Sequence, residues 1–279
     1  MKKVLNIFII FIALGALVYQ FKPQLFPKAP CAEPIPYILG TFDTQFNISK
    51  SYFLSALADA EAVWEKPFGK NLFAYIPEGS PREEDLKINL IYDYRQQATS
   101  KLVSLGITVK NDRASYDMLK AKFTALKVQY AAEKSAYEAR VRSFNQSSRT
   151  DLVEFKSLQV EQKNLNDKVD EINALVVALN RLVAILNLSV DQYNTVNVAR
   201  GESFEEGVYT SNGSNREIDI YEFSSRAKLV RVLAHELGHA LGLDHVDDSK
   251  AIMYKLNKGN SETLTQTDLN TLKVKCQIK

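Results

Sequence analysis

All three histidines of the 279-residue chain lie within HELGHALGLDH, a stretch that runs from His235 to His245. Imidazole nitrogens bind ions such as zinc, and a helix brings residues four apart onto one face. His235 and His239 have this spacing, so a single ion could contact both side chains. Glu236 lies beside them, where its carboxylate could reach a water molecule on that ion.

His245 cannot join this pair on a continuous helix, because ten residues at about 1.5 Å each would carry it some 15 Å from His235 along the axis. The chain must turn, and Gly242 is placed to allow it, since glycine accepts the left-handed conformation that ends a helix. Three neutral imidazoles would leave one position of a tetrahedral zinc ion open, as in catalytic sites. The alternative is a core helix whose histidines bind no metal; the complete pattern HExxHxxGxxH favours the metal site.

This extended pattern resembles that of the metzincin zinc endopeptidases, and the Met-Tyr pair that follows it is most similar to the matrixin group. The resemblance implies that His235, His239 and His245 bind Zn²⁺, that Glu236 is the general base, and that Met253 supports the site from below. Met253 could equally be an ordinary core residue. The implied fold is an α+β, zincin-like catalytic domain with a mixed twisted sheet and an active-site helix, and the implied activity is hydrolysis of peptide bonds by metal-activated water.

Two positions depart from the matrixin pattern. Val246 stands where matrixins usually have serine, and Lys255 replaces a common proline. Some other metzincins have a tyrosine ligand at the position of Lys255, so Tyr254 is expected to be structural. By resemblance, protein or peptide substrates would lie along the edge strand before the active-site helix, for which EEGVYTS at 205–211 is the candidate.

Composition excludes several other classes of protein. The chain is 46% hydrophobic and 24% charged with a formal net charge of +2, as in an ordinary globular protein. No lysine- or arginine-rich stripe is interleaved with aromatic residues, so we expect no nucleic-acid partner.

The N-terminal residues have the composition of a targeting segment. Two lysines precede an apolar run, which predicts either a signal anchor or a cleaved signal peptide over residues 1–21, followed by a proline-containing linker at 22–30. An uncleaved segment would bring a membrane partner. In both cases the rest of the chain is expected outside the cytoplasm, anchored or secreted.

Cys31 and Cys276 are the two cysteines of the chain. In an oxidising compartment they could form a disulfide that joins the two ends of one domain. Two unpaired thiols are the alternative.

The remaining pattern predicts strands and helices on both sides of a long helical region. Strands are expected at 36–46, 71–77, 86–94, 205–211 and 216–223, and helices at 49–66, 224–242 and 264–276, the last with Thr265 as its cap.

Between these parts, apolar residues follow alternating steps of three and four, interrupted by the turn-like NQSSRT. This spacing predicts an antiparallel coiled-coil hairpin over residues 111–196 that protrudes as an arm. The expected seam consists of Tyr116, Leu119, Phe123, Leu126, Tyr130, Tyr137, Val141, Phe144, Leu158, Leu165, Val169, Ile172, Val176, Leu179, Val183, Leu186, Val190 and Tyr193. The arm could be a rigid insertion, a self-association surface or a docking site for a protein partner.

The simplest organisation is one catalytic domain, made of residues 31–110 and 197–279, interrupted by the hairpin. Two functions follow from it. The first is a zinc endopeptidase, and the alternative is an envelope or surface adaptor that works through its arm and keeps a vestigial or structural metal site. The intact Glu236 favours the enzyme, because a structural site does not need a carboxylate beside its ligands.

Overall fold

The computed structural model describes residues 31–77, 82, 85–110, 112–147, 151–186, 206–213, 215–255 and 262–277. The targeting segment predicted at 1–21 and the linker at 22–30 lie outside these residues. Across the described ranges, no helix combines the length and the apolar character needed to cross a membrane.

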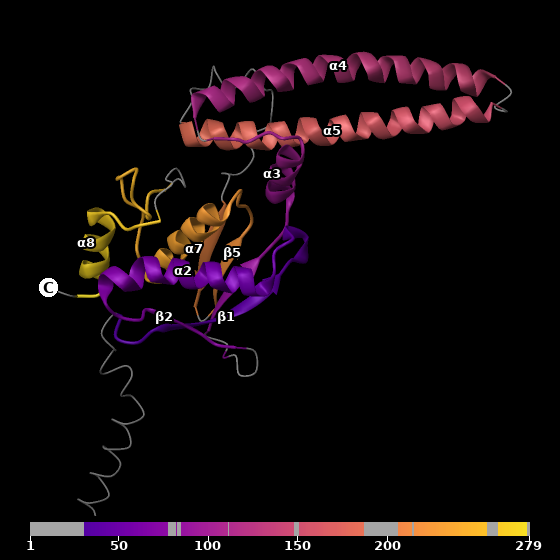
Figure 1. The fold of residues 1–279 in the computed structure, drawn as a ribbon. Coiled ribbons are helices and arrows are strands. Elements are labelled where there is room, and N and C mark those ends of the chain that lie inside the picture. Colours follow the sequence, from indigo (N-terminus) through magenta and orange to yellow (C-terminus); the bar gives the residue numbers. More distant parts are fainter. Residues whose placement is uncertain are drawn as a thin grey trace, which may run out of the picture.

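A five-stranded mixed sheet forms the centre of the globular part (Figure 1). Its spatial order is β2-β1-β3-β5-β4. The strands are β1 (Ile35–Phe42), β2 (Phe73–Tyr75), β3 (Leu86–Leu90), β4 (Gly207–Asn212) and β5 (Asn215–Ile220). The first four in this order are parallel, while β4 runs antiparallel to β5 and lies at the edge. The sheet therefore brings strands from both flanks of the helical region together, as the mixed-sheet prediction required.

Two helices pack together against this sheet. Ser49 caps α2 (Lys50–Phe68) and Ser225 caps α7 (Arg226–Ala240), each by accepting a hydrogen bond from a backbone N–H of the first turn. Both helices contribute side chains to one hydrophobic core, which includes the fully buried Trp64. Since α2 and α7 come from opposite flanks, this core joins the two halves of the sequence.

The predicted strands are longer than the strands observed, and in two of them the excess residues begin a helix. The strand expected at 36–46 ends at Phe42, and the one expected at 86–94 ends at Leu90. In both places an aspartate begins a helix: Asp43 caps the 3₁₀ turn η1 (Thr44–Phe46), and Asp93 caps α3 (Tyr94–Ser104). Helix α3 was not predicted, because the aromatic residues around its cap extend the strand pattern.

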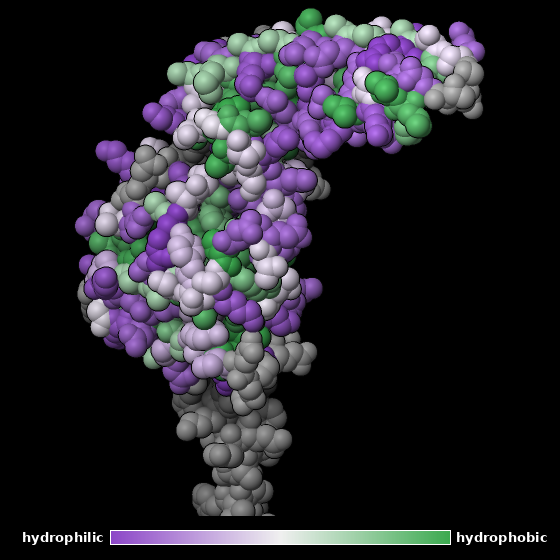
Figure 2. All heavy atoms as spheres, turned by 45° about the vertical axis from the view of Figure 1, so that its right-hand side comes forward, coloured by the Kyte–Doolittle hydropathy of each residue, from purple (hydrophilic) through white to green (hydrophobic). Residues whose placement is uncertain are grey.

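The long helical region contains α4 (Arg113–Gln146) and α5 (Leu152–Leu186), which lie side by side as an arm above the globular part (Figure 1). Ion pairs show that they run antiparallel: Lys122 contacts Glu171, and Lys168 contacts Glu133. Hydrophilic residues cover much of the arm (Figure 2).

A second hydrophobic core lies at the base of this arm. It combines Ala98 and Leu102 of α3 with residues of α4 and α5. The predicted seam of α5 is confirmed here at Leu179, which is fully buried. It is wrong in omitting Leu175 and Leu182, which are also fully buried, and in including Val176, which is only partly buried. The buried face is shifted because α5 packs against α3 as well as α4. Val190 and Tyr193 of the predicted seam lie outside the described residues.

The C-terminal helix α8 (Gln266–Lys275) begins with a capping box in which Thr265 and Asp268 exchange hydrogen bonds. Directly after it, Cys276 is joined to Cys31 by a disulfide. The segment before β1 is thereby attached to the end of α8.

Candidate metal centre

Helix α7 carries two of the three histidines, and backbone carbonyls orient both rings. His235 Nδ1 lies 2.7 Å from the carbonyl oxygen of Ile252, and His239 Nδ1 lies 2.8 Å from that of Leu243. A carbonyl oxygen can only accept, so Nδ1 carries the proton in each ring. The Nε2 lone pairs of both neutral rings are therefore available to a metal ion.

A left-handed glycine returns the chain to this pair. Gly242 has φ +80°, its N–H donates to the His239 carbonyl, and the Leu243 N–H donates to the Gly238 carbonyl. These bonds form a Schellman motif, which ends α7 and redirects the backbone. An L side chain is strained at this φ, so the turn explains the glycine between the second and third histidines.

The three Nε2 atoms converge, each lying 3.2 Å from the other two. Ligand nitrogens at 2.0–2.1 Å from a tetrahedral zinc ion lie roughly 3.3 Å apart. With Nδ1 protonated in His235 and His239, their Nε2 atoms are both acceptors and repel unless a cation lies between them. The donor set therefore fits a zinc ion held by three imidazoles.

Burial also favours the neutral form of one ligand. Burial, the neighbouring His239 and His245, and the Arg231 charge together lower the pKa of His235 to about 3, against the opposing effect of the Ile252 carbonyl. A neutral imidazole is the form that binds metal, so His235 is ready to do so at neutral pH.

Glu236 is buried, with only 4% of its surface exposed, and lies on the same helix as His235 and His239. A Cβ atom added to Gly207, at the start of β4, would lie 3.1 Å from Glu236 Cγ and 2.9 Å from Val232 Cγ2. The absence of a side chain at Gly207 thus lets the edge strand approach this carboxylate closely. No motif in the sequence pointed to Gly207.

Met253 is completely buried beneath the histidine-bearing helix. A Cβ atom added to Gly238 would lie 2.3 Å from Met253 Sδ and 2.8 Å from Trp64 Cζ2. Trp64 also donates a hydrogen bond from Nε1 to the Ala234 carbonyl at 2.8 Å. Gly238 therefore allows Met253 and Trp64 to pack directly on α7, a role that depends on residues far away in the sequence.

The loop that carries Met253 is fixed from two sides. The carboxylate of Asp268, which is fully buried, accepts hydrogen bonds from the backbone N–H groups of Ile252 and Met253 at 2.9 and 3.0 Å. Arg231 donates to the Ala251 carbonyl at 2.6 Å. Neither Asp268 nor Arg231 was predicted, since each acts through a backbone group that no spacing pattern reveals.

The two positions that depart from the matrixin pattern lie along this loop. The Val246 N–H donates to the Met253 carbonyl at 2.9 Å, and Val246 pairs with Tyr254 as a short parallel bridge. Lys255 is exposed. Val246 therefore contributes a backbone hydrogen bond that holds the third histidine, His245, near the loop that carries Met253.

Comparison with protein families gives one match. The family model described as Matrixin matches residues 115–274, which is more than half of the chain and includes α5, α7 and the three histidines. No curated protein and no solved structure matches the chain. Together with the convergent imidazoles on and after α7, this match shows that the chain belongs to the matrixin family.

Proposed function

We propose that the chain is a zinc-dependent endopeptidase that hydrolyses peptide bonds in protein substrates. The observation that carries this proposal is the convergence of three Nε2 atoms at 3.2 Å, two of them on rings whose other nitrogen faces a carbonyl. A catalytic zinc site needs this open set of three ligands and a neighbouring general base. Glu236 is that base in our proposal.

The residues of the chain have distinct tasks in this reaction. His235, His239 and His245 would hold the zinc ion, which supplies a Lewis acid that polarises the scissile carbonyl and acidifies water. The Glu236 carboxylate accepts the proton of the attacking water and delivers it to the leaving amine nitrogen. Its near-complete burial keeps bulk water from competing for that proton.

We propose that substrate binds as an added strand along β4. This strand is the edge of the sheet, and its only neighbour among the described strands is β5. An edge strand can pair its free backbone groups with an extended peptide. Gly207 brings the beginning of β4 next to Glu236, so a peptide on this edge would pass close to the proposed base.

The direct test is proteolysis by the full chain, measured with an unfolded protein substrate together with the zinc content. We expect a purified preparation to contain one zinc ion per chain and to lose activity with a chelator. Glu236→Gln should retain the zinc and lose activity by about 10²–10⁴-fold, the usual contribution of a general base.

Glu138→Gln is the matched control, because it makes the same change on the exposed surface of α4. Its activity should equal that of the unchanged protein. Equal proteolysis by the unchanged protein, the Glu236→Gln variant and the chelated sample would disprove the proposal.

The domain organisation and location belong to the same proposal. Residues 31–110 and 197–279 would form the catalytic domain, and residues 111–196 a coiled-coil insertion. The disulfide between Cys31 and Cys276 supports a location outside the cytoplasm, where such bonds persist. The adaptor alternative is not favoured, because the ligand geometry and the buried Glu236 are both intact.

A further inference from the structure

The first turns of α5, at the tip of the arm, carry a cluster of exposed apolar side chains. Leu152, Val153 and Val160 are 73%, 80% and 61% exposed, and Phe155 is 46% exposed. Four of the eleven large hydrophobic side chains that are exposed among the described residues thus lie within the first three turns of one helix. Figure 2 shows hydrophobic atoms gathered at this far end of the arm.

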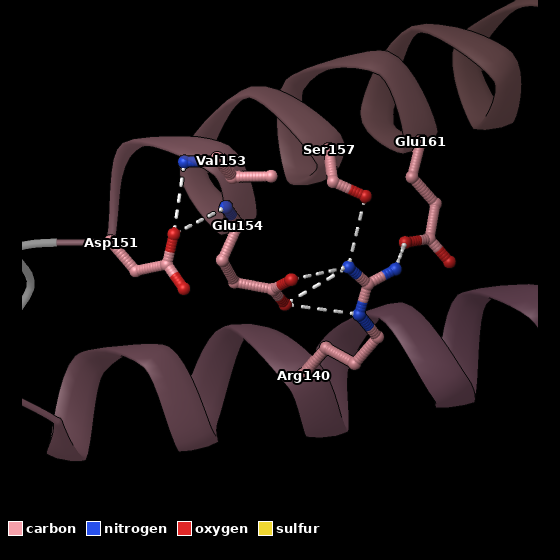
Figure 3. Close-up of polar contacts among 6 residues, drawn as sticks. All are labelled: Arg140, Asp151, Val153, Glu154, Ser157 and Glu161. Atoms are coloured by element: carbon pink, nitrogen blue, oxygen red, sulfur yellow. Dashed lines mark hydrogen bonds and ion pairs between the residues drawn. The ribbon is translucent and has the colours of Figure 1, made fainter.

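The tip is held in place by polar contacts on its inner side (Figure 3). Arg140 of α4 donates to Glu154 through Nε and Nη2 and forms an ion pair with Glu161. Asp151 accepts hydrogen bonds from the backbone N–H groups of Val153 and Glu154. The Phe155 ring also lies against Phe144 of α4, with the ring centroids 6.2 Å apart. The first turns of α5 are therefore fixed before any partner arrives, and Leu152, Val153 and Val160 remain exposed.

The charged side chains at the tip also divide between the inner and the outer side of the arm. Glu154 and Glu161 face Arg140, and Asp151 caps the helix, so these carboxylates are used within the arm. Lys156 is exposed on the outer side. At 100° per residue, Leu152, Lys156 and Val160 lie in one row, so the lysine is surrounded by apolar side chains.

We propose that this arm-tip surface, made of Leu152, Val153, Lys156 and Val160, docks on the surface of an anionic lipid bilayer. A helix face with apolar residues and outward cations lies in the interface, where the apolar side chains enter the lipid and the lysine reaches the headgroups. A second copy of the chain fits this surface less well, because a two-fold symmetric contact would bring the Lys156 side chains of the two copies together. With about 1.5 Å per residue, α5 holds the tip roughly 50 Å from its base.

The test places an environment-sensitive fluorophore on the tip of the full chain. Val153→Cys and Val128→Cys each supply one reactive thiol, since the described cysteines form a disulfide. Val128 is the matched control, because it is an exposed valine on the same arm but away from the tip. We expect vesicles of phosphatidylcholine with phosphatidylglycerol to raise the emission at 153 by at least about twofold, with quenching by spin-labelled lipid, and to leave 128 unchanged.

Two further measurements show whether the arm-tip surface binds a lipid bilayer or a second copy of the chain. Adding Lys156→Glu to the labelled Val153→Cys variant should reduce the response to that seen with pure phosphatidylcholine vesicles. An unchanged signal at 153, or an equal signal at 128, would overturn the proposal. So would a change at 153 that follows protein concentration without vesicles, since it would identify a second copy as the partner. The readout is local and needs no proteolysis, so its failure leaves the proposed peptidase activity untouched.

Discussion

At the scale of single residues, the candidate metal centre depends on groups outside its three histidines. The carbonyl of Ile252 orients His235, and the backbone N–H of Ile252 donates to the buried carboxylate of Asp268. The same carboxylate accepts from the Met253 N–H and from the N–H and hydroxyl of Thr265. One side chain thus links the cap of α8 to the loop that positions a ligand.

We therefore expect Asp268→Ala to weaken both the fold and the metal site. Removing the carboxylate leaves several buried N–H groups without an acceptor, which should lower the free energy of unfolding by about 2–4 kcal/mol. Loss of a group that positions a ligand should reduce zinc affinity by about 10–100-fold. Urea unfolding and zinc competition with a chromophoric chelator measure the two effects.

Asp247→Ala is the control, since it removes the same charge from an exposed position in the neighbouring loop. It should change neither quantity by more than the error of the measurement. Unaltered zinc affinity in Asp268→Ala would show that the loop keeps its conformation without the carboxylate.

The sequence indicated the candidate ligands more readily than the residues that hold them in place. His235, Glu236, His239, Gly242 and His245 could be proposed because their roles follow from spacing along one helix and one turn. Asp268, Arg231 and Gly238 could not, because each acts on a partner brought near only by the fold. Gly238 contacts Met253 and Trp64, and the latter lies in a helix of the opposite flank.

At the scale of elements, a buried ion pair joins the arm to the loop before α7. Arg181 of α5 and Glu222 are 8% and 1% exposed, and their side chains lie 3.0 Å apart. The Thr99 hydroxyl of α3 also donates to Glu222 at 2.8 Å, and the Phe223 N–H donates to Gln96 of α3 at 3.0 Å. Three separate elements therefore meet at the residues that lead into α7.

Arg181→Met should destabilise the protein strongly, because it leaves the Glu222 charge buried without its cation. We expect the free energy of unfolding to fall by about 3–5 kcal/mol in denaturant titrations. The double variant Arg181→Met/Glu222→Gln should recover much of this loss, since no buried charge remains. A double variant no more stable than Arg181→Met would show that packing at Arg181, rather than its charge, is what matters.

The start of α4 provides a prediction about pH. A hydrogen bond from the Ser115 N–H lowers the pKa of Asp112, the N-cap of this helix. Because the folded pKa is depressed, the stabilisation is present above the unfolded value of about 3.9 and is lost as pH falls through the folded pKa.

Asp112→Asn retains a capping side chain that does not titrate. The difference in unfolding free energy between the two proteins should be constant above about pH 5 and should shift in favour of the asparagine variant toward pH 2. Urea titrations monitored by helical circular dichroism measure it. A difference that stays constant down to pH 2 would contradict the prediction.

Regular periodicity made most of the elements predictable. The mixed sheet, α2, α7, α8 and the two long helices follow from apolar spacing and caps. Helix α3 was missed, because its few buried residues, including Ala98 and Leu102, form no clear helical pattern beside the aromatic residues that precede it. The shifted buried face of α5 has the same origin, since it depends on contact with α3.

At the scale of the whole molecule, the disulfide connects the beginning of the described chain to the metal centre. Cys31 precedes β1, and Cys276 follows α8, which carries Asp268. Through Asp268, α8 supports the loop that orients His235. The bond therefore holds in place a helix on which the site depends, although neither sulfur is near a ligand in sequence.

Cys31→Ser/Cys276→Ser should consequently lose stability and hold zinc less tightly. The bond spans a sequence separation of 245 residues, and restricting a loop of that length in the unfolded chain stabilises the fold by up to about 5 kcal/mol. Urea unfolding measures the stability, and zinc competition at low urea, where the variant is still folded, measures the affinity. Combining this variant with Asp268→Ala provides the control, because the two changes should affect zinc affinity less than additively if both act through α8. Fully additive losses would mean that the disulfide influences the site by another route, and an unchanged affinity in the cysteine variant would confine its role to the stability of the fold.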